Sequence, residues 1–314
     1  MDTTFTFLGL TVHAYGACAA VAALVLLAGL YKKLPQGAAA LMGVLSMVLG
    51  IAGARTLYCV CNLSTFTETF ENPWLMLNFF DGGLSMPGMI AGLLLAAAIT
   101  AKVNQISFAR VMDALCVPMG LSIAVLRFGE QFTDLGVGKA VNEGFATEKL
   151  AWLFQQSRMG VAVEYRLNVW AYEAVAGVII FAAVLFCLRR LSACEGRTAL
   201  FFFSLYGASQ VILVSMRDDG HMLLIFLRVG QLAAALMPII SCAILLKGRS
   251  RRAKLVSWLT ILLCAAVLVV LEFSLDGRLT IGNPTLLRDY SIMAAVCIGL
   301  FAPPCALLFS RKNA

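Results

Sequence analysis

The sequence predicts an all-α fold, a polytopic membrane bundle of about nine transmembrane helices. Hydrophobic residues make up 61% of the 314 residues, charged residues make up 13%, and long apolar runs recur along the chain. A soluble domain averages about 25% charged residues, so this composition favours a core that lies in a bilayer. A spanning helix needs about 20 mostly apolar residues. Runs of about that length lie near residues 10–31, 37–60, 82–102, 108–128, 168–188, 198–216, 221–246, 255–273 and 290–310.

Basic residues lie mainly in alternate loops between these runs. Most of the 24 basic residues fall on one side of the predicted membrane, whereas only Asp113 and Glu195 of the 17 acidic residues do. Because basic loops stay in the cytoplasm, the N-terminus is predicted outside and the C-terminus in the cytoplasm, which agrees with an odd number of spans. The net charge of +7 therefore reflects membrane topology, and no nucleic-acid partner is expected. The basic loop residues are Lys32, Lys33, Lys102, Arg110, Arg189, Arg190, Arg197, Lys247, Arg249, Arg251, Arg252, Lys254, Arg311 and Lys312.

The predicted spans divide into a main domain and a C-terminal extension. Residues 1–246 hold seven spans and form the main transmembrane domain, and residues 247–314 add two helices to the same bundle. The longest outward segment, residues 129–167, is too short to bury a core of its own. We expect it to rest on the bundle as a cap or lid.

A glycine-rich stretch over residues 72–92, NPWLMLNFFDGGLSMPGMIAG, leads into the third span. We predict that Asp81 caps this helix, and that the glycines let a second backbone or a lipid come close. A helix start offers unpaired N–H groups and a partial positive charge, so it suits an anion such as a phospholipid headgroup. The candidate phospholipid-binding residues of this stretch are Asp81, Gly82, Gly83, Ser85 and Gly88.

Ionisable groups inside spans are costly, so each is a functional candidate. In the predicted orientation the polar candidates cluster in the outer half of the bundle. This one-sided cluster favours binding or chemistry at the outer leaflet over transport, which needs polar residues through both halves. Glu272, at the outer end of the eighth span, is expected to be solvated. The outer-half candidates are His13, Tyr15, Arg55, Arg127, Glu130, Gln210, Arg217, His221 and Arg228.

Several of these residues also have a purely structural explanation. His13 and Tyr15 suit the polar and aromatic belt at a membrane interface, and a long side chain such as that of Arg55 can reach the interface from within a span. Arg127 and Glu130 are three residues apart, which suits an ion pair within one helix. Arg217 and the two aspartates after it suit a surface turn. Arg228 is predicted two to three turns inside the seventh span, too deep for a surface residue.

Ten cysteines are spread over the chain. Most lie inside apolar runs, where cysteine behaves as a small hydrophobic residue. No Cys/His spacing matches a metal site, so we expect neither a metal nor another cofactor.

The order and spacing of five segments resemble those of a known family. The segments read VHAYG, GARTLYCV, NPWLMLNFFDGGLSMPGMIAG, LRFGEQFTDLGVG and YGASQVILVSMRDDGHMLLIFLRVGQ. Together, over roughly residues 10–246, they resemble the bacterial prolipoprotein diacylglyceryl transferases, and the DGG entry to the third helix is their most specific part. The last two predicted helices lie outside the seven-helix pattern of that family.

The resemblance implies an activity and a location. Family members move the diacylglyceryl group of phosphatidylglycerol to the lipobox cysteine thiol of an exported prolipoprotein, without a metal or soluble cofactor. It therefore implies a multi-pass protein of the bacterial cytoplasmic (plasma) membrane. The expected partners are phosphatidylglycerol, or another anionic phospholipid, and the prolipoprotein signal peptide. Tyr15 matches the family's tyrosine, Arg127 matches the arginine that opens the signature, and Gly138 matches a glycine near its end.

The chain departs from the family at four positions. Pro87 takes the place of a histidine in a Phe-His-Gly-Gly turn, and Glu130 takes the place of an asparagine. Gln210 and Val214 take the places of an arginine and a glutamate in the sixth helix. These departures leave open a non-catalytic member that binds anionic phospholipid, a lipoprotein or a membrane partner. A transporter subunit is a third alternative.

Diacylglyceryl transfer needs two kinds of protein group. Cations and helix N–H groups must hold the phosphate as it leaves. A base must help form the thiolate, because a free cysteine has a pKa of about 8.5. For the phosphate we expect Arg127, with Arg55 and the helix start at 82–88, and then Arg217 and Arg228. Candidate bases are His13, Glu130 and His221, and Tyr15 is expected to orient the lipid.

Overall fold

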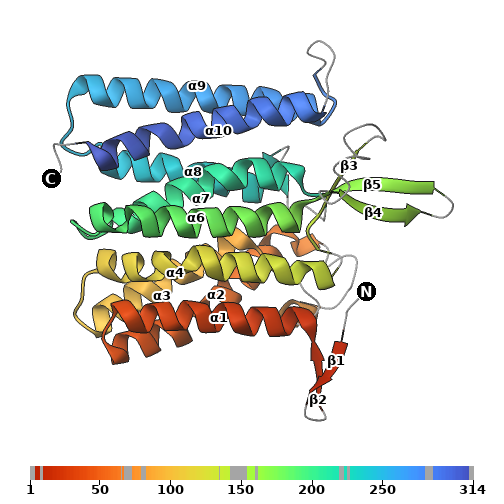
Figure 1. Ribbon diagram of the computed structural model, residues 1–314, viewed down its shortest axis with the longest axis horizontal. Coiled ribbons are helices and arrows are strands. Elements are labelled where there is room, and N and C mark those ends of the chain that lie inside the picture. The colour runs from red at the N-terminus through yellow and green to blue at the C-terminus, as the bar shows by residue number, and fades with distance from the viewer. Residues whose placement is uncertain are drawn as a thin grey trace.

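A computed structural model shows long helices packed side by side, with short strands at one end of them (Figure 1). It describes residues 4–7, 10–64, 66, 73–78, 83–133, 135–141, 154–159, 162–218, 223–224, 227–279 and 286–310. Nine helices of 17 residues or more lie within these described residues. They are α1 (Ala14–Lys33), α2 (Gln36–Cys61), α3 (Met86–Val103), α4 (Phe108–Gly129), α6 (Val169–Leu191), α7 (Arg197–Met216), α8 (Val229–Leu245), α9 (Arg251–Leu275) and α10 (Leu286–Phe309).

The helices confirm the predicted all-α polytopic membrane bundle. Within the described residues, eight of them are long and apolar enough to cross a membrane, and α8 is a shorter apolar helix. Each of the nine predicted apolar runs overlaps one of the helices. Apolar run length was therefore a sufficient signal for the helical framework. Which membrane face each end of the bundle occupies stays a prediction.

Short strands gather where α1 begins and where α4 and α7 end (Figure 1). β1 (Thr4–Phe7) pairs with β2 (Leu10–His13), and β6 (Leu223–Leu224) pairs with β7 (Leu227–Arg228). β3 (Val137–Val141), β4 (Phe154–Met159) and β5 (Ala162–Asn168) form an antiparallel sheet in the order β3-β5-β4. We call this end of the bundle the strand end. The predicted cap at 129–167 thus contains a small sheet, which the sequence prediction missed.

Two spans begin later than predicted, because strands occupy their first residues. Residues 10–13 pair with β1, so α1 begins at Ala14. Residues 223–228 contain the β6–β7 pair, so α8 begins at Val229. Arg228 is the N-cap of α8, with extended backbone, and the prediction that it lies turns deep inside a helix was wrong.

The third helix also begins later than predicted. α3 begins at Met86, and its N-cap is Ser85. Asp81, the predicted cap, lies outside the described residues. Gly83 has a φ of 65°, a left-handed conformation that interrupts a helix before this point. Pro87 sits in the first turn, where its missing N–H has no intrahelical partner to lose.

Glycines bring α2 and α3 into backbone contact. A Cβ on Gly53 would lie 2.5 Å from the carbonyl oxygen of Gly88, and a Cβ on Gly92 would lie 2.0 Å from that of Leu49. Neither distance is possible for a real side chain, so each position needs a glycine. The prediction that a second backbone comes close to Gly88 is confirmed, and that backbone belongs to α2.

Of the two C-terminal helices, α10 packs against α7 and α8, and α9 packs against α10 (Figure 1). Val211 of α7 and Ala234 of α8 share one buried cluster with Leu268 of α9 and Met293 of α10. The cluster continues down the helices through Cys242, Ile261, Cys297 and Leu300. The extension is therefore joined to the bundle by an apolar core.

Gly92→Ala tests the α2–α3 contact. The added methyl group has to push the helices apart, and overpacking of this kind costs about 1–3 kcal/mol. We expect a lower unfolding free energy when the purified protein is titrated with a denaturing detergent. Gly16→Ala is the matched control, because a Cβ on Gly16 of α1 meets nothing within 4 Å. Equal stability of the two variants would contradict the contact.

Candidate functional site

Four charged side chains meet at the strand end. Arg127 lies in the last turn of α4, Glu130 opens the short 3-10 helix η3 (Glu130–Phe132), Glu173 lies near the start of α6, and Arg217 is the C-cap of α7. We call these four residues the charge cluster. The Oε2 atom of Glu173 lies 3.0 Å from Arg127 Nε and 2.7 Å from Arg217 Nη1. Glu130 bonds to Arg127 through Oε1, and its Oε2 lies 3.4 Å from Arg217 Nη2.

Burial makes the charges of the cluster depend on one another. The side chain of Glu173 is 0% exposed and that of Glu130 5%, whereas Arg127 and Arg217 keep 16% and 13%. Buried charges are tolerated when they are paired and hydrogen-bonded, and here two guanidiniums match two carboxylates. The carboxylates are therefore the more buried members of the cluster, and the arginines keep the larger exposed fractions.

Two tyrosines border the cluster. Tyr206 of α7 is buried, and it is close enough to Arg127 to interact with it electrostatically. Tyr15 of α1 packs against Gly129, where a Cβ would lie 3.3 Å from its ring. Tyr15 is also close enough to Glu130 and Arg127 to interact with them electrostatically. The first helix therefore contributes its predicted tyrosine to the site.

Strand β3 and the turn before it bring glycine backbone to the cluster. Gly136 has a φ of 74°, and a Cβ there would lie 2.7 Å from Glu130 Oε2. Gly138 forms a β-bridge with Arg217, and the next residue, Asp218, donates its N–H to Val137 O at 2.9 Å. The predicted residues Tyr15, Arg127, Glu130, Gly138 and Arg217 thus come together.

Arg55 lies apart from the cluster and holds the chain that precedes α3. Its guanidinium donates to the carbonyl oxygens of Leu75 at 2.7 Å, Met76 at 2.9 Å and Gly83 at 3.3 Å. It also lies over the rings of Tyr58 and Phe66, with centroid distances of 5.7 and 5.5 Å. These contacts give Arg55 a structural task. Phosphate binding by Arg55 stays a prediction without geometric support.

The described part of the glycine-rich helix start also has packing tasks. A Cβ on Gly83 would lie 2.5 Å from the Tyr58 ring, and the N–H of Ser85 donates to Ala54 O at 3.0 Å. Gly88 is buried against Gly53. Anion binding at this helix start therefore stays a prediction as well. Three further candidates, Asp81, Gly82 and His221, lie outside the described residues.

Two remaining candidates lie in contrasting surroundings. Gln210 of α7 is 1% exposed, and its Oε1 has no hydrogen-bond partner among the described residues. His13 is exposed and is the N-cap of α1. A solvent-accessible imidazole at the strand end can exchange protons, whereas the amide of Gln210 offers no proton-transfer chemistry.

A second polar network lies behind Arg217. Arg228 Nη1 donates to the carbonyl oxygens of Val214 and Ser215, both at 2.8 Å, and of Arg217 at 3.2 Å. Arg228 Nε lies 3.8 Å from Glu272 Oε1 on α9. Glu272 is 6% exposed, so the prediction that it is solvated was wrong. Arg228 satisfies the last carbonyls of α7, where a positive charge also suits the helix dipole.

Lys139 of β3 links the small sheet to α9. Its Nζ lies 3.7 Å from Asp276 Oδ1, just after the end of α9. Burial lowers the pKa of Lys139, and the neighbouring charge of Arg228 lowers that pKa further. The surroundings of this amine therefore disfavour its charged form.

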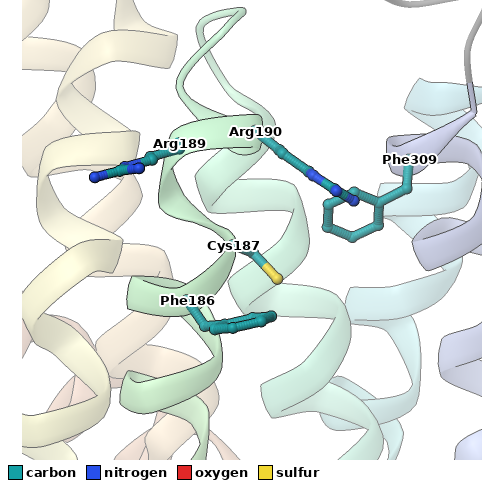
Figure 2. Close-up of a pocket in the computed structure, with 5 residues that line it drawn as sticks. All are labelled: Phe186, Cys187, Arg189, Arg190 and Phe309. Carbon is teal, nitrogen blue, oxygen red and sulfur yellow. The ribbon is translucent and has the colours of Figure 1, made fainter.

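A surface hollow of about 410 Å³ lies at the opposite end of the bundle from the strand end. It is lined by Phe186, Cys187, Arg189 and Arg190 of α6 and by Phe309 of α10. Figure 2 shows Arg190 pointing toward Phe309, whereas Arg189 points away from it. The hollow lies at the last turns of α6 and α10, so it belongs to a different region from the charge cluster.

Sequence reasoning missed Glu173, the residue that joins both arginines. The signal was available, because Glu173 is an acidic residue inside the apolar run VWAYEAVAG, where an ionisable group is costly. Glu272 carried the same signal near the end of the eighth span. Its partners lie 41 and 57 residues earlier in the chain, at Gln231 and Ser215, so sequence proximity could not reveal them.

Comparisons with known proteins give a consistent result. A family model described as "prolipoprotein diacylglyceryl transferase" matches residues 2–247. A phosphatidylglycerol–prolipoprotein diacylglyceryl transferase of Symbiobacterium thermophilum is 28% identical over 196 residues, which cover 62% of this chain and 71% of that protein. The corresponding protein of Clostridioides difficile is 27% identical over 182 residues, 58% of this chain and 67% of that protein. That of Bacillus velezensis is 24% identical over 206 residues, with coverages of 65% and 73%. The charge cluster lies inside the matched region, and α9 and α10 lie beyond it.

Glu173→Gln tests the energetic role of the shared carboxylate. The amide keeps the shape of the side chain but leaves the two guanidiniums with one carboxylate, so we expect a loss of about 3–5 kcal/mol in the unfolding free energy. The measurement is a denaturing-detergent titration of the purified protein. Glu195→Gln is the control, because Glu195 is exposed at the opposite end and bonds to the exposed Ser107. A change no larger than that of the control would contradict the role of Glu173.

Lys139→Met tests the lowered pKa. With a lowered folded-state pKa, the unfolded chain binds more protons than the folded chain, up to the unfolded pKa of about 10.4. Stability of the wild type should therefore rise, relative to Lys139→Met, as the pH increases toward that value. Thermal unfolding midpoints measured from about pH 7 to about pH 10 test this. Lys102→Met, at an exposed site, should run parallel to the wild type, and parallel curves for Lys139→Met would contradict the prediction.

Proposed function

The chain belongs to the prolipoprotein diacylglyceryl transferase family, and from that premise we propose that it moves the diacylglyceryl group of phosphatidylglycerol to the cysteine thiol of a prolipoprotein. The family model covers the whole charge cluster. The relatives are named for phosphatidylglycerol as the lipid donor and a prolipoprotein as the acceptor. The eight apolar helices support a multi-pass membrane protein, for which we propose the bacterial plasma membrane.

One observation carries the proposal at the level of residues. Guanidiniums from two helices that are distant in the sequence meet around a single carboxylate oxygen of Glu173. Arginine presents a planar array of N–H donors that suits phosphate oxygens, and Glu173 and Glu130 hold both arrays in place. Arg127 and Arg217 are therefore our proposed phosphate-binding residues. Tyr15 borders them and is proposed to orient the lipid headgroup.

The chemistry is a substitution at carbon. The cysteine sulfur forms a bond to the carbon of the diacylglyceryl group that bears the phosphate, and the bond from that carbon to the phosphate oxygen breaks. Glycerol phosphate leaves with the electron pair, and the thiol proton passes to a base. Arginines stabilise the negative charge that builds on the phosphate, and in a site with little water this effect is large. The protein supplies no nucleophile of its own in this scheme.

A base must accept the thiol proton, and three residues are candidates for it. His13 is exposed at the strand end, and its imidazole is suited to general-base catalysis. Glu130 holds both arginines through its two oxygens, which favours an orienting role. We therefore propose His13 before Glu130, and His221 stays a candidate. From the distribution of basic loop residues we propose that this end of the bundle faces the outer side, where the acceptor thiol of an exported protein would arrive.

A second function is favoured by specific residues. Pro87 and Gln210 occupy positions where the resemblance implies a histidine and an arginine, and Gln210 is buried without a partner for its Oε1 among the described residues. A member without these groups could bind anionic phospholipid without transferring it. Both functions use the charge cluster, so turnover decides between them.

Arg127→Ala in a host depleted of its own transferase tests the enzyme function. We expect the wild type to restore lipid modification of a reporter prolipoprotein, and Arg127→Ala to lower the rate by at least about 100-fold. Modification is read by mass spectrometry of the mature lipoprotein at matched protein levels. Arg110→Ala, on an exposed residue at the other end of α4, is the control and should keep activity.

Bound lipid separates the remaining outcomes. Phosphatidylglycerol that co-purifies with the wild type and is lost in Arg127→Ala, without any modified reporter, would support the non-catalytic function. If neither modification nor a cluster-dependent lipid is found, the proposal fails as a whole.

A further inference from the structure

The inference concerns the two helices that lie beyond the region matched by the family model. That region ends at residue 247, and α9 begins at Arg251. Near the strand end both extra helices reach Ser215 in the last turn of α7, two residues before Arg217. α9 does so through Glu272, and α10 does so through Tyr290, whose hydroxyl donates to Ser215 O at 3.1 Å.

Glu272 is the centre of this contact. Its Oε2 accepts hydrogen bonds from Ser215 Oγ at 2.8 Å and from Gln231 Nε2 at 3.0 Å. Its Oε1 lies 3.8 Å from Arg228 Nε. Glu272 thus bonds to α7 directly and also pairs with Arg228, which donates to carbonyl oxygens at the end of α7. Each partner is itself buried, so the geometry is protected from competing water.

Arg228 transmits the contact to Arg217. It donates to three carbonyl oxygens at the end of α7, including that of Arg217. Because Arg228 is 8% exposed, it needs a nearby carboxylate, and Glu272 is the buried one. If the Glu272 carboxylate is lost, we expect the Arg228 guanidinium to shift toward the more exposed Asp276, whose Oδ1 lies 4.0 Å from Arg228 Nη2. The hydrogen bonds from Arg228 to the carbonyl oxygens of α7 would then break.

We infer that Glu272 is a positioning residue for Arg217, and that it acts through Arg228 and the last turn of α7. The inference rests on the proposed function, because it assumes that Arg217 holds the lipid phosphate. Glu272 touches neither the lipid nor the charge cluster in this scheme. It fixes the position of the Arg217 backbone, and therefore the position at which the Arg217 guanidinium pairs with Glu173. α9 and α10 therefore contribute to the site although they lie outside the matched region.

Glu272→Gln tests the inference in the full-length protein. A misplacement of about 1 Å at a reacting group can cost up to about 100-fold in rate, so we expect a loss between about 10-fold and 100-fold in reporter modification. Glu272→Asp keeps the negative charge, so its rate of reporter modification should lie between those of Glu272→Gln and the wild type. Asp289→Asn is the matched control, because Asp289 is a buried carboxylate whose bonds are to Ser274 and Arg288 of α9 and α10. This control should keep activity.

A double variant separates positioning from general destabilisation. Arg217→Lys keeps a charge but loses the fork of donors, so it should retain measurable activity at a lower rate. If Glu272 acts through Arg217, adding Glu272→Gln to Arg217→Lys should lower the rate much less than it does in the wild type. If the fold-loss in rate of the double variant equals the product of the fold-losses of the two single variants, the inference is overturned.

Hydrogen exchange gives a readout that needs no activity. In Glu272→Gln the backbone amides of residues 214–218 should exchange faster, whereas Asp289→Asn should leave them unchanged. If the wild type is inactive, the proposed function is wrong, but the exchange of residues 214–218 still decides whether Glu272 positions the end of α7. An active wild type with unchanged exchange and unchanged activity in Glu272→Gln would remove the inference alone.

Discussion

The charge cluster depends on one oxygen atom, Oε2 of Glu173, which accepts from both Arg127 and Arg217. Without Glu173 the two neighbouring guanidiniums would repel each other, and without the guanidiniums the buried carboxylate of Glu173 would lose stability because it would carry an unpaired charge. Together they bring the ends of α4 and α7 to the start of α6. Glu130, Tyr206 and the glycines of the β3 region then fill the surroundings of these groups. The position of the site follows from this mutual neutralisation rather than from any single helix.

Much of the fold could be predicted from the sequence, because bilayer thickness imposes a length on apolar runs. The boundaries that failed are those where strands precede a helix, at residues 10–13 and at residues 223–224 and 227–228. Apolar strand residues look like the first turn of a span when no partner strand is known. The sheet at β3–β5 was missed for the same reason, since it is held together by pairing rather than by a local pattern.

The candidate site was predicted in part. Tyr15, Arg127, Glu130, Gly138 and Arg217 were proposed from the sequence and lie together in the structure. Arg55 and Arg228 were equally plausible phosphate-binding residues, because both were predicted inside a span. In the structure both donate hydrogen bonds to backbone carbonyl oxygens. A buried arginine can satisfy a cramped backbone as well as an anion, and only geometry distinguishes the two. Glu173 escaped attention because a lone acid in an apolar run suggests no partner until the helices are assembled.

The shortness of α8 has a consequence for the surrounding lipid. Its 17 residues rise about 25 Å, several ångströms less than the roughly 30 Å of a bilayer's hydrocarbon layer. Such hydrophobic mismatch favours local thinning of the membrane. Because α8 begins directly after Arg228, thinning beside it would draw phospholipid headgroups down toward the level of the arginines. The protein would then deform the membrane to meet its site, instead of lifting a lipid out of it.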